Sequence, residues 1–322
     1  MTYEPSRKPS AASPGLVIHG IEIREALGKG GMGVVYKGWD PELQRFAAVK
    51  MISEEALEDE AFVTRFRREA RAASLVNHPN VARVYSAGKH EGRGYYVMEY
   101  VEGTTLAQLL DRQGQIPVSD CVRYLRQACE GLRAAHQAGV VHRDVKPSNL
   151  MLDKQGVLKI VDFGLARRMV GDARVTRAGA FVGSPAYISP EQARGEEVDH
   201  RSDIYSLGAT CYHLLAGRPP YLGDTPLATL AQHITAKLPS LAERVPGIPP
   251  HLCTVIERMM AKDPGSRYQT YDDLFADLAV AQMGETQKTR PVGISRSSRR
   301  LVVVAAVVVL FAVAIVVALA VL

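Results

Sequence analysis

The apolar positions of the chain form short strand-like runs near its beginning and longer helical stretches further on. β-Branched and aromatic residues recur from Ile21, and the apolar runs 47–50 and 95–101 predict buried strands. The later pattern predicts, in order, two helices within 104–140, short strands at 150–152 and 158–161, and an apolar helix beginning near Ser202. From residue 21 onward, the chain therefore has the periodicity of a folded protein.

The two ends of the chain differ from the part between them. Residues 1–20 are rich in Ser, Pro, Arg and Lys, which predicts a disordered N-terminal arm. Residues 283–300 are polar and basic and predict a juxtamembrane linker. Residues 301–322 are entirely apolar and, at about 1.5 Å per residue, would cross a hydrocarbon core of about 30 Å. They predict a transmembrane helix, the alternative being a long buried helix of a globular domain.

The positive charge of the chain is concentrated beside this apolar segment. The formal net charge is +5. The basic residues after position 281 are Lys288, Arg290, Arg296, Arg299 and Arg300. The rest of the chain is nearly neutral, so the pattern predicts no nucleic-acid partner. The apolar segment predicts a single-pass membrane protein. Because the basic residues precede this segment, the positive-inside rule predicts that residues 21–282 face the cytoplasm. A tail-anchored protein and a chain truncated beyond the span both fit this pattern.

The four cysteines, at positions 121, 129, 211 and 253, form no C-x-x-C pair. We interpret them as reduced thiols in the core. A metal site is the alternative, but the spacing typical of zinc ligands is absent.

A glycine-rich segment follows the first predicted strand. Residues 28–35 have the pattern G-x-G-x-x-G-x-V, whose glycines let backbone N–H groups approach phosphates closely. A dinucleotide-binding fold uses the same glycine spacing, but there a helix opens after the glycines. Val34, Val35 and Tyr36 continue as a strand instead, so the pattern favours a phosphate-binding hairpin.

A lysine ends the buried strand 47–50, and a glutamate lies in the helix predicted for residues 60–75. Burial of a lysine is costly unless an anion meets it, so Lys50 predicts a phosphate contact, with an exposed strand-end lysine as the alternative. Glu69 shares a helix face with Phe62, Phe66 and Ala73. An acid in an apolar stripe needs a partner, and we expect Lys50 to be that partner.

Four polar residues lie on or beside the two short strands. Asp144, Lys146 and Asn149 precede the run 150–152, and Asp162 follows the run 158–161. Such strands would aim these side chains at one place. Two carboxylates, an amide and a lysine suit phosphoryl transfer, in which a hydroxyl is oriented, metal ions are held and charge on the phosphoryl group is neutralised.

The segment H-R-D-V-K-P-S-N followed by D-F-G resembles the catalytic loop and metal-binding element of protein kinases. With the glycine pattern and Lys50, the resemblance covers about residues 21–282. It implies a bilobal α+β fold with an N-lobe (21–103) of antiparallel sheet plus one main helix. The C-lobe (104–282) would be mainly helical.

The resemblance also implies ATP and Mg²⁺, for which Mn²⁺ could substitute. Asp144 would be the catalytic base, Lys146 would stabilise the γ-phosphoryl group, and Asn149 and Asp162 would hold the metal. The nucleotide would contact Leu27, Gly28, Lys29, Gly30, Gly31, Met32, Gly33, Val35, Ala48, Lys50, Glu69, Met98, Glu99, Val101 and Met151. Met98 would gate the pocket behind adenine, although core packing is an alternative for a buried methionine.

The segment between Asp162 and Glu191 corresponds in the resemblance to the activation loop, closed by Ser189-Pro190-Glu191. Thr176 is the candidate phosphorylation site, because Arg143 precedes Asp144 as in kinases whose loop is ordered by a phosphate. Ser184 would lie at the acceptor site, near Asp144 and Lys146. A solvated loop hydroxyl is the alternative for both. Asp203 would brace the catalytic loop, and Glu191 would pair with Arg267.

The chain is similar to bacterial, eukaryotic-like serine/threonine protein kinases anchored in the membrane. Lys146 is placed as in serine/threonine rather than tyrosine kinases. Protein substrates, autophosphorylation of the activation loop and a homodimer for phosphorylation between copies are expected from the resemblance. The alternatives are a pseudokinase acting as a nucleotide-binding scaffold and a small-molecule kinase of related fold.

Overall fold

The computed structural model describes residues 15–30, 33–52, 68–163 and 184–288 of the chain, with side chains up to residue 279. The chain divides at residue 281, and the fold below is that of the part before it. The predicted linker beyond residue 288 and the apolar segment 301–322 lie outside the described residues. Within the described residues, none of the helices combines the length and apolar character needed to cross a bilayer.

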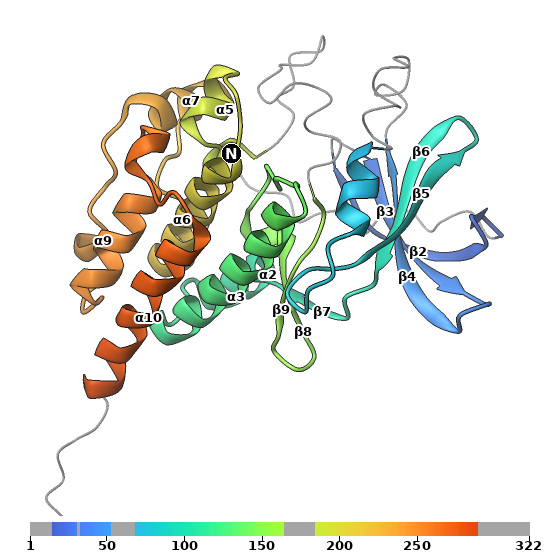
Figure 1. The fold of residues 1–322 in the computed structure, drawn as a ribbon, viewed down its shortest axis with the longest axis horizontal. Helices are drawn as coiled ribbons and strands as arrows, with labels where there is room; N and C mark the ends of the chain where they lie inside the picture. Colours follow the sequence, from blue (N-terminus) through green and yellow to red (C-terminus); the bar gives the residue numbers. More distant parts are fainter. Residues whose placement is uncertain (1–14, 31–32, 53–67, 164–183, 289–322) are drawn as a thin grey trace, which may run out of the picture. The chain divides into compact units, whose positions relative to one another are not determined.

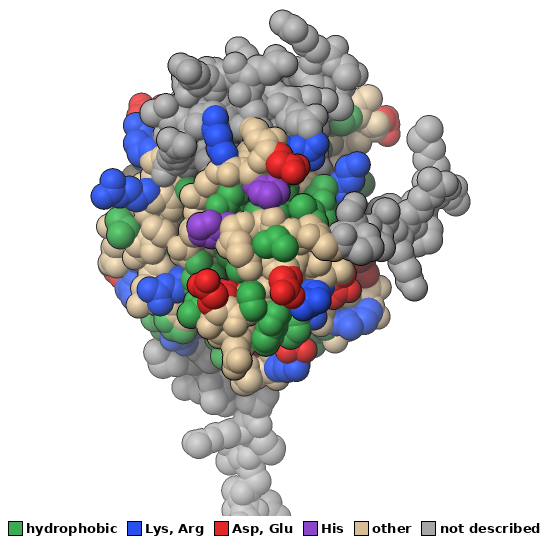
Figure 2. Space-filling model, turned by 90° about the vertical axis from the view of Figure 1, so that its right-hand side faces the viewer, with side chains coloured by type: hydrophobic (Ala, Val, Ile, Leu, Met, Phe, Trp, Pro, Cys, Tyr) green, Lys and Arg blue, Asp and Glu red, His purple; other side chains and the backbone are tan. Residues whose placement is uncertain are grey.

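A six-stranded antiparallel sheet forms the first lobe (Figure 1). Its strand order is β1-β2-β3-β4-β6-β5, and every neighbouring pair is antiparallel. The strands are β1 (Val17–Ile18), β2 (Ile21–Gly30), β3 (Gly33–Asp40), β4 (Arg45–Ile52), β5 (Val84–His90) and β6 (Arg93–Glu99). The predicted antiparallel sheet is therefore confirmed. On the face of the molecule that lies to the right in Figure 1, acidic and basic side chains are interspersed with hydrophobic ones (Figure 2).

The ordered domain begins before residue 21, its predicted first residue, and includes the end of the predicted disordered arm 1–20. β1 pairs with β2, and the side chain of Ile18 is completely buried. It packs in a small core with Ile21, Ile23 and Val49, which explains why the strand forms. The boundary is corrected accordingly, while residues 1–14 lie outside the described part.

The second lobe begins with a three-stranded antiparallel sheet, β7-β8-β9. Its strands are β7 (Gly103–Thr105), β8 (Leu150–Asp153) and β9 (Leu158–Ile160). The two predicted helices are α2 (Leu106–Gln113) and α3 (Val118–Gln137). Thr105 and Gln108 form a reciprocal capping box, which fixes the point where β7 gives way to α2.

From residue 184 onward, the described part of this lobe is mainly helical (Figure 1). Its α-helices are α5 (Pro190–Arg194), α6 (His200–Ala216), α7 (Pro226–Thr235), α8 (Leu241–Arg244), α9 (Pro250–Met259) and α10 (Tyr271–Lys288). Almost every side chain of α6 is buried, as its apolar sequence predicts. α10 continues past residue 282, where we placed the end of the domain. The four cysteines are buried free thiols, as predicted.

Candidate active site

The glycine-rich segment forms a hairpin, as the sequence predicts. Leu27, Gly28 and Lys29 lie in β2, and Gly30 faces Gly33 at the start of β3. A side chain at Gly33 is excluded, because its φ is 135° and a Cβ would lie 1.8 Å from the Met51 carbonyl oxygen. Gly31 and Met32 lie outside the described residues.

The register of three strands positions the side chains beneath this hairpin. Lys50 in β4 faces Val35 in β3 on one side and Tyr96 in β6 on the other. Ala48 faces Met98 in the same way, and both side chains are buried in the main core. Lys50 is only 6% exposed, so this lysine is buried and requires an anionic partner.

That partner in the structure is Asp162. The Lys50 ammonium contacts both oxygens of the carboxylate, with Nζ 2.5 Å from Oδ2. The Tyr96 hydroxyl donates a hydrogen bond to Oδ1 of the same carboxylate. Asp162 has a φ of 58°, in the left-handed region that few residues other than glycine adopt. Its carboxylate is therefore fixed by two donors from the first lobe.

Opposing effects act on the pKa of Asp162. Burial raises the pKa, whereas the charge of Lys50 and the hydrogen bonds from Lys50 and Tyr96 lower it. The balance leaves the pKa below its ordinary value, so the group is a carboxylate at neutral pH. Burial and the neighbouring carboxylate raise the pKa of Tyr96, which keeps its proton available for donation.

Glu69 lies in the helical segment 68–74, and the rest of the predicted helix falls outside the described residues. Its expected pairing with Lys50 stays a prediction.

Three of the predicted residues, Asp144, Lys146 and Asn149, lie together in the catalytic loop. Asp144 is buried, with its side chain 9% exposed, and Lys146 Nζ lies 2.7 Å from its Oδ2. Asn149, at the end of a short 3₁₀ turn (Pro147–Asn149), donates from Nδ2 to the Asp144 carbonyl (2.8 Å) and to Oδ2 (3.1 Å). These bonds fix the carboxylate, and they direct the amide so that Oδ1 is the Asn149 atom able to bind a cation.

Asp203, in the first turn of α6, holds the backbone of this loop. Its two carboxylate oxygens accept hydrogen bonds from the His142 and Arg143 N–H groups, each 2.7 Å long. Arg143 has a φ of 65°, so the loop turns sharply just before Asp144. The predicted brace is confirmed.

The catalytic loop and Asp162 are joined through the backbone. Val161 N–H donates to the Asn149 carbonyl at 2.9 Å, and His142 Nε2 lies 3.3 Å from the Val161 carbonyl. The charge of Lys146 contributes to lowering the pKa of Asp162. Asp144, Lys146, Asn149, Asp162 and Lys50 are thus brought together, as predicted.

The predicted adenine-binding segment connects the two lobes. Glu99 ends β6, its carboxylate lies 3.0 Å from Lys159 Nζ, and its N–H donates to the Arg83 carbonyl at 2.8 Å. Val101 is buried just beyond it, and Met151 lies in β8 opposite Lys159. The assignment of these residues to adenine stays a prediction.

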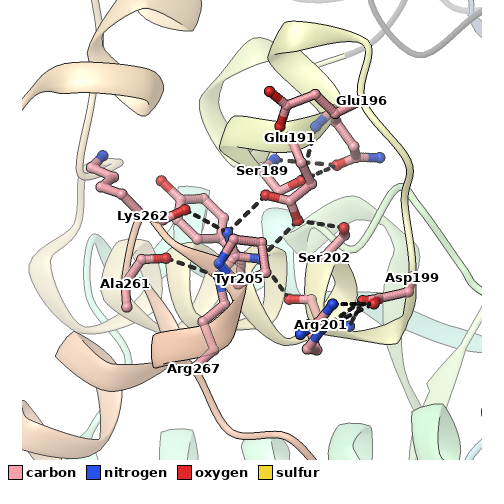
Figure 3. A network of polar contacts seen from close by, with 12 residues as sticks. Ser189, Glu191, Glu196, Asp199, Arg201, Ser202, Tyr205, Ala261, Lys262 and Arg267 are labelled. Carbon is pink, nitrogen blue, oxygen red and sulfur yellow. Dashed lines mark hydrogen bonds and ion pairs between the residues drawn. The ribbon is translucent and has the colours of Figure 1, made fainter.

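The segment after the activation loop is anchored by an ion pair. Glu191 at the start of α5 accepts two hydrogen bonds from Arg267, as predicted, and a third from the Ser202 hydroxyl (Figure 3). Ser184 precedes the 3₁₀ turn Pro185–Tyr187. Its predicted contacts with Asp144 and Lys146 stay untested, and Thr176 lies outside the described residues.

The donor set fits a magnesium ion that is also held by phosphates. Mg²⁺ usually takes one or two protein carboxylates or amides, together with water and substrate phosphates. Asn149 Oδ1 and the Asp162 carboxylate are donors of this kind. Among the described residues, no group of three His, Cys, Asp or Glu side chains could hold a metal without such help.

Tyr96 is a residue of the site that the sequence does not predict. Its place within the predicted buried strand 95–101 indicates only a core side chain. Its position directly across from Lys50 follows from the β4–β6 register, and the sequence gives no direct signal of that register.

A comparison with family models matches residues 21–277 to the protein kinase domain. This chain belongs to the protein kinase family. It is 40% identical over 268 residues to the serine/threonine-protein kinase PknB of Mycobacterium leprae, and 41% identical over 269 residues to PknB of Mycolicibacterium smegmatis. Each alignment covers 82% of this chain and 43% of the relative, so the chain spans less than half the length of these curated kinases.

Solved structures agree with this assignment. The kinase domain of Mycobacterium tuberculosis PknI aligns with a TM-score of 0.69 at 28% identity, covering 84% of this chain and all of that one. The bilobal kinase fold expected from the sequence is therefore confirmed.

Proposed function

We propose that this chain is a serine/threonine protein kinase that transfers the γ-phosphoryl group of ATP to Ser or Thr hydroxyls of proteins. The observation that supports it most is the cluster of Asp144, Lys146 and Asn149 beside the Lys50–Asp162 pair. The family and the PknB relatives support the same class of reaction.

In the proposed reaction, the acceptor hydroxyl approaches Asp144, which orients it and takes its proton. The acceptor oxygen forms a bond to the γ-phosphorus while the bond to the bridging oxygen breaks, and ADP leaves. Lys146, 2.7 Å from the Asp144 carboxylate, would stabilise charge on the transferred group. Lys50 would contact the α- and β-phosphates. Mg²⁺, held by Asn149 and Asp162, would neutralise phosphate charge.

The test uses the full chain with Mg²⁺ and γ-labelled ATP. We expect transfer to itself and to a generic protein acceptor, on serine or threonine. Asp144→Asn should retain ATP binding and lose nearly all transfer, because the amide cannot take the proton. ATP binding without transfer, across metals and acceptors, would instead establish a nucleotide-binding scaffold. Transfer to a metabolite but not to protein would indicate a small-molecule kinase.

The proposal extends to regulation and to the membrane. Phosphorylation at Thr176 between two copies of the chain would activate it, and labelling whose rate per molecule is independent of protein concentration would contradict this.

Residues 301–322 would anchor the kinase in the membrane, with the kinase domain facing the cytoplasm. The supporting observation is their uninterrupted apolar sequence beside Arg296, Arg299 and Arg300. Retention of the full chain, but not of residues 1–300, on lipid vesicles in high salt would test it.

A further inference from the structure

Tyr96 contacts the candidate metal ligand from inside the first lobe. Its side chain is 2% exposed, and its hydroxyl donates to Asp162 Oδ1. The same carboxylate meets Lys50, which faces Tyr96 across the β4–β6 pair. One carboxylate therefore has two donors of different kinds, an ammonium and a phenol.

We propose that Tyr96 is a positioning residue for the divalent metal. Its hydroxyl would hold the Asp162 carboxylate in the orientation that binds the cation. This inference rests on the proposed kinase function and adds a residue to its metal site. Tyr96 touches neither the acceptor nor the phosphates in this scheme and acts only through Asp162.

The two donors have different tasks once a nucleotide is bound. Lys50 is proposed to meet the α- and β-phosphates, so its ammonium cannot be devoted to Asp162 alone. The Tyr96 hydroxyl can stay on Oδ1, so that Oδ2, which now contacts Lys50, would be available to the metal once Lys50 meets the phosphates. A neutral donor also adds no positive charge to repel a cation. Such outer partners of metal ligands fix their orientation and tune their affinity.

Asp162 needs an outer support because of its backbone. A non-glycine residue at φ 58° is held in a sparsely populated conformation, which persists only where the surroundings specify it. Tyr96 is suited to this task. Its ring is packed in the main core and its strand is hydrogen-bonded on both sides, to β4 and β5. The position of its hydroxyl is therefore set by the rigid sheet.

Tyr95 provides a matched control on the same strand. It points to the opposite face of the sheet, where it is 5% exposed and packs in the small core with Ile18 and Val97. Tyr95→Phe and Tyr96→Phe each remove one hydroxyl from a buried ring of β6. Only the second removes a hydrogen bond to Asp162.

The test measures metal binding directly, in the full chain. Electron paramagnetic resonance follows Mn²⁺ binding to the protein–ADP complex, and calorimetry follows ADP binding in EDTA. For Tyr96→Phe we expect an affinity for Mn²⁺ that is lower by about tenfold, as for loss of an outer partner of a metal ligand. Metal-free ADP affinity should stay within about twofold, because in the proposed scheme this hydroxyl bonds to Asp162 and not to the nucleotide. Tyr95→Phe should match wild type in both measurements.

Three results from the phenylalanine variants would overturn the inference. They are an unchanged Mn²⁺ affinity in Tyr96→Phe, an equal loss in Tyr95→Phe, and a parallel loss of metal-free ADP binding, which would indicate a packing role. Tyr96→Met, which also lacks the hydroxyl, must reproduce the metal defect, and thermal unfolding of each variant checks folding. Failure of the proposed function is seen separately, as a wild-type chain that binds Mn²⁺–ADP but transfers no phosphate.

Discussion

Arg267 donates two hydrogen bonds to Glu191 across 76 residues of sequence, from Nη1 to Oε1 and from Nη2 to Oε2, each 2.7 Å long. Both side chains are almost completely buried. The same guanidinium also donates to the carbonyls of Ala261 and Lys262 (Figure 3). The pair therefore ties α5, which follows the activation loop, to the segment that precedes α10.

Breaking this pair should destabilise the domain strongly. Arg267→Met leaves the Glu191 carboxylate buried without its cation, so we expect a loss of about 3–5 kcal/mol in the free energy of unfolding. Chemical denaturation checks the value. Arg123→Gln is the control, because its 2.7 Å pair with Asp120 is exposed and should contribute about 0–1 kcal/mol. Equal losses in the two variants would contradict the expectation.

The Glu191–Arg267 pair should also make stability depend on pH. Burial raises the pKa of Glu191, whereas the hydrogen bonds and charge of Arg267 and the hydrogen bond from Ser202 lower it. The net effect is a pKa below the ordinary value. A lowered native pKa means that the pair stabilises the fold above the unfolded pKa of Glu, about 4.3. That contribution is lost as the pH falls through the native pKa.

Denaturation of wild type and Glu191→Gln between pH 7 and pH 3 measures this effect. The stability difference between them should be largest above about pH 5 and shrink below it. A difference that stays constant over the whole range would show that Glu191 does not titrate in this way.

Asp203→Asn should impair transfer while sparing nucleotide binding. The carboxylate accepts from two backbone N–H groups, and an amide offers only one oxygen, so one of these donors loses its partner. We expect the loop carrying Asp144 to shift and the transfer rate to fall roughly a hundredfold. ADP affinity, measured by calorimetry, should change little.

The control for Asp203→Asn is Asp199→Asn. Asp199 caps the same helix, but its side chain is 43% exposed and bonds to Arg201 rather than to the catalytic loop. A similar loss of transfer in the control would mean that the effect arises from α6 and not from the brace.

Two glycines of the phosphate-binding hairpin should respond differently to alanine. At Gly33, φ is 135° and the new Cβ would collide with the Met51 carbonyl. Gly33→Ala should therefore lower the free energy of unfolding of the first lobe by about 1–3 kcal/mol or more. At Gly28, a Cβ meets nothing within 4 Å, so Gly28→Ala should unfold like wild type. Thermal unfolding compares the two. Equal stability would show that the hairpin relaxes around the new side chain.

The sequence predicted much of this site because its polar residues are close together along the chain. Asp144, Lys146 and Asn149 lie within six residues, on a loop bounded by short apolar runs. Their contacts with one another follow from local geometry. The strands of the first lobe and the helices α2, α3 and α6 follow in the same way from local periodicity, whereas the antiparallel sheet and the mainly helical second lobe were implied by the resemblance to protein kinases. The N-terminal boundary did not follow from local periodicity, because the burial of Ile18 depends on strands further along the chain.

Only the tertiary structure decided which donors meet the Asp162 carboxylate. Lys50 and Tyr96 are separated from it by 112 and 66 residues, and nothing local to either residue specifies the contact. The register between β4 and β6 places them opposite each other, and the Asp162 carboxylate, on a residue with left-handed backbone, meets both. Register and backbone conformation are settled by the packing of the whole sheet. The sequence thus determined which chemical groups are present, and the fold determined which of them share one carboxylate.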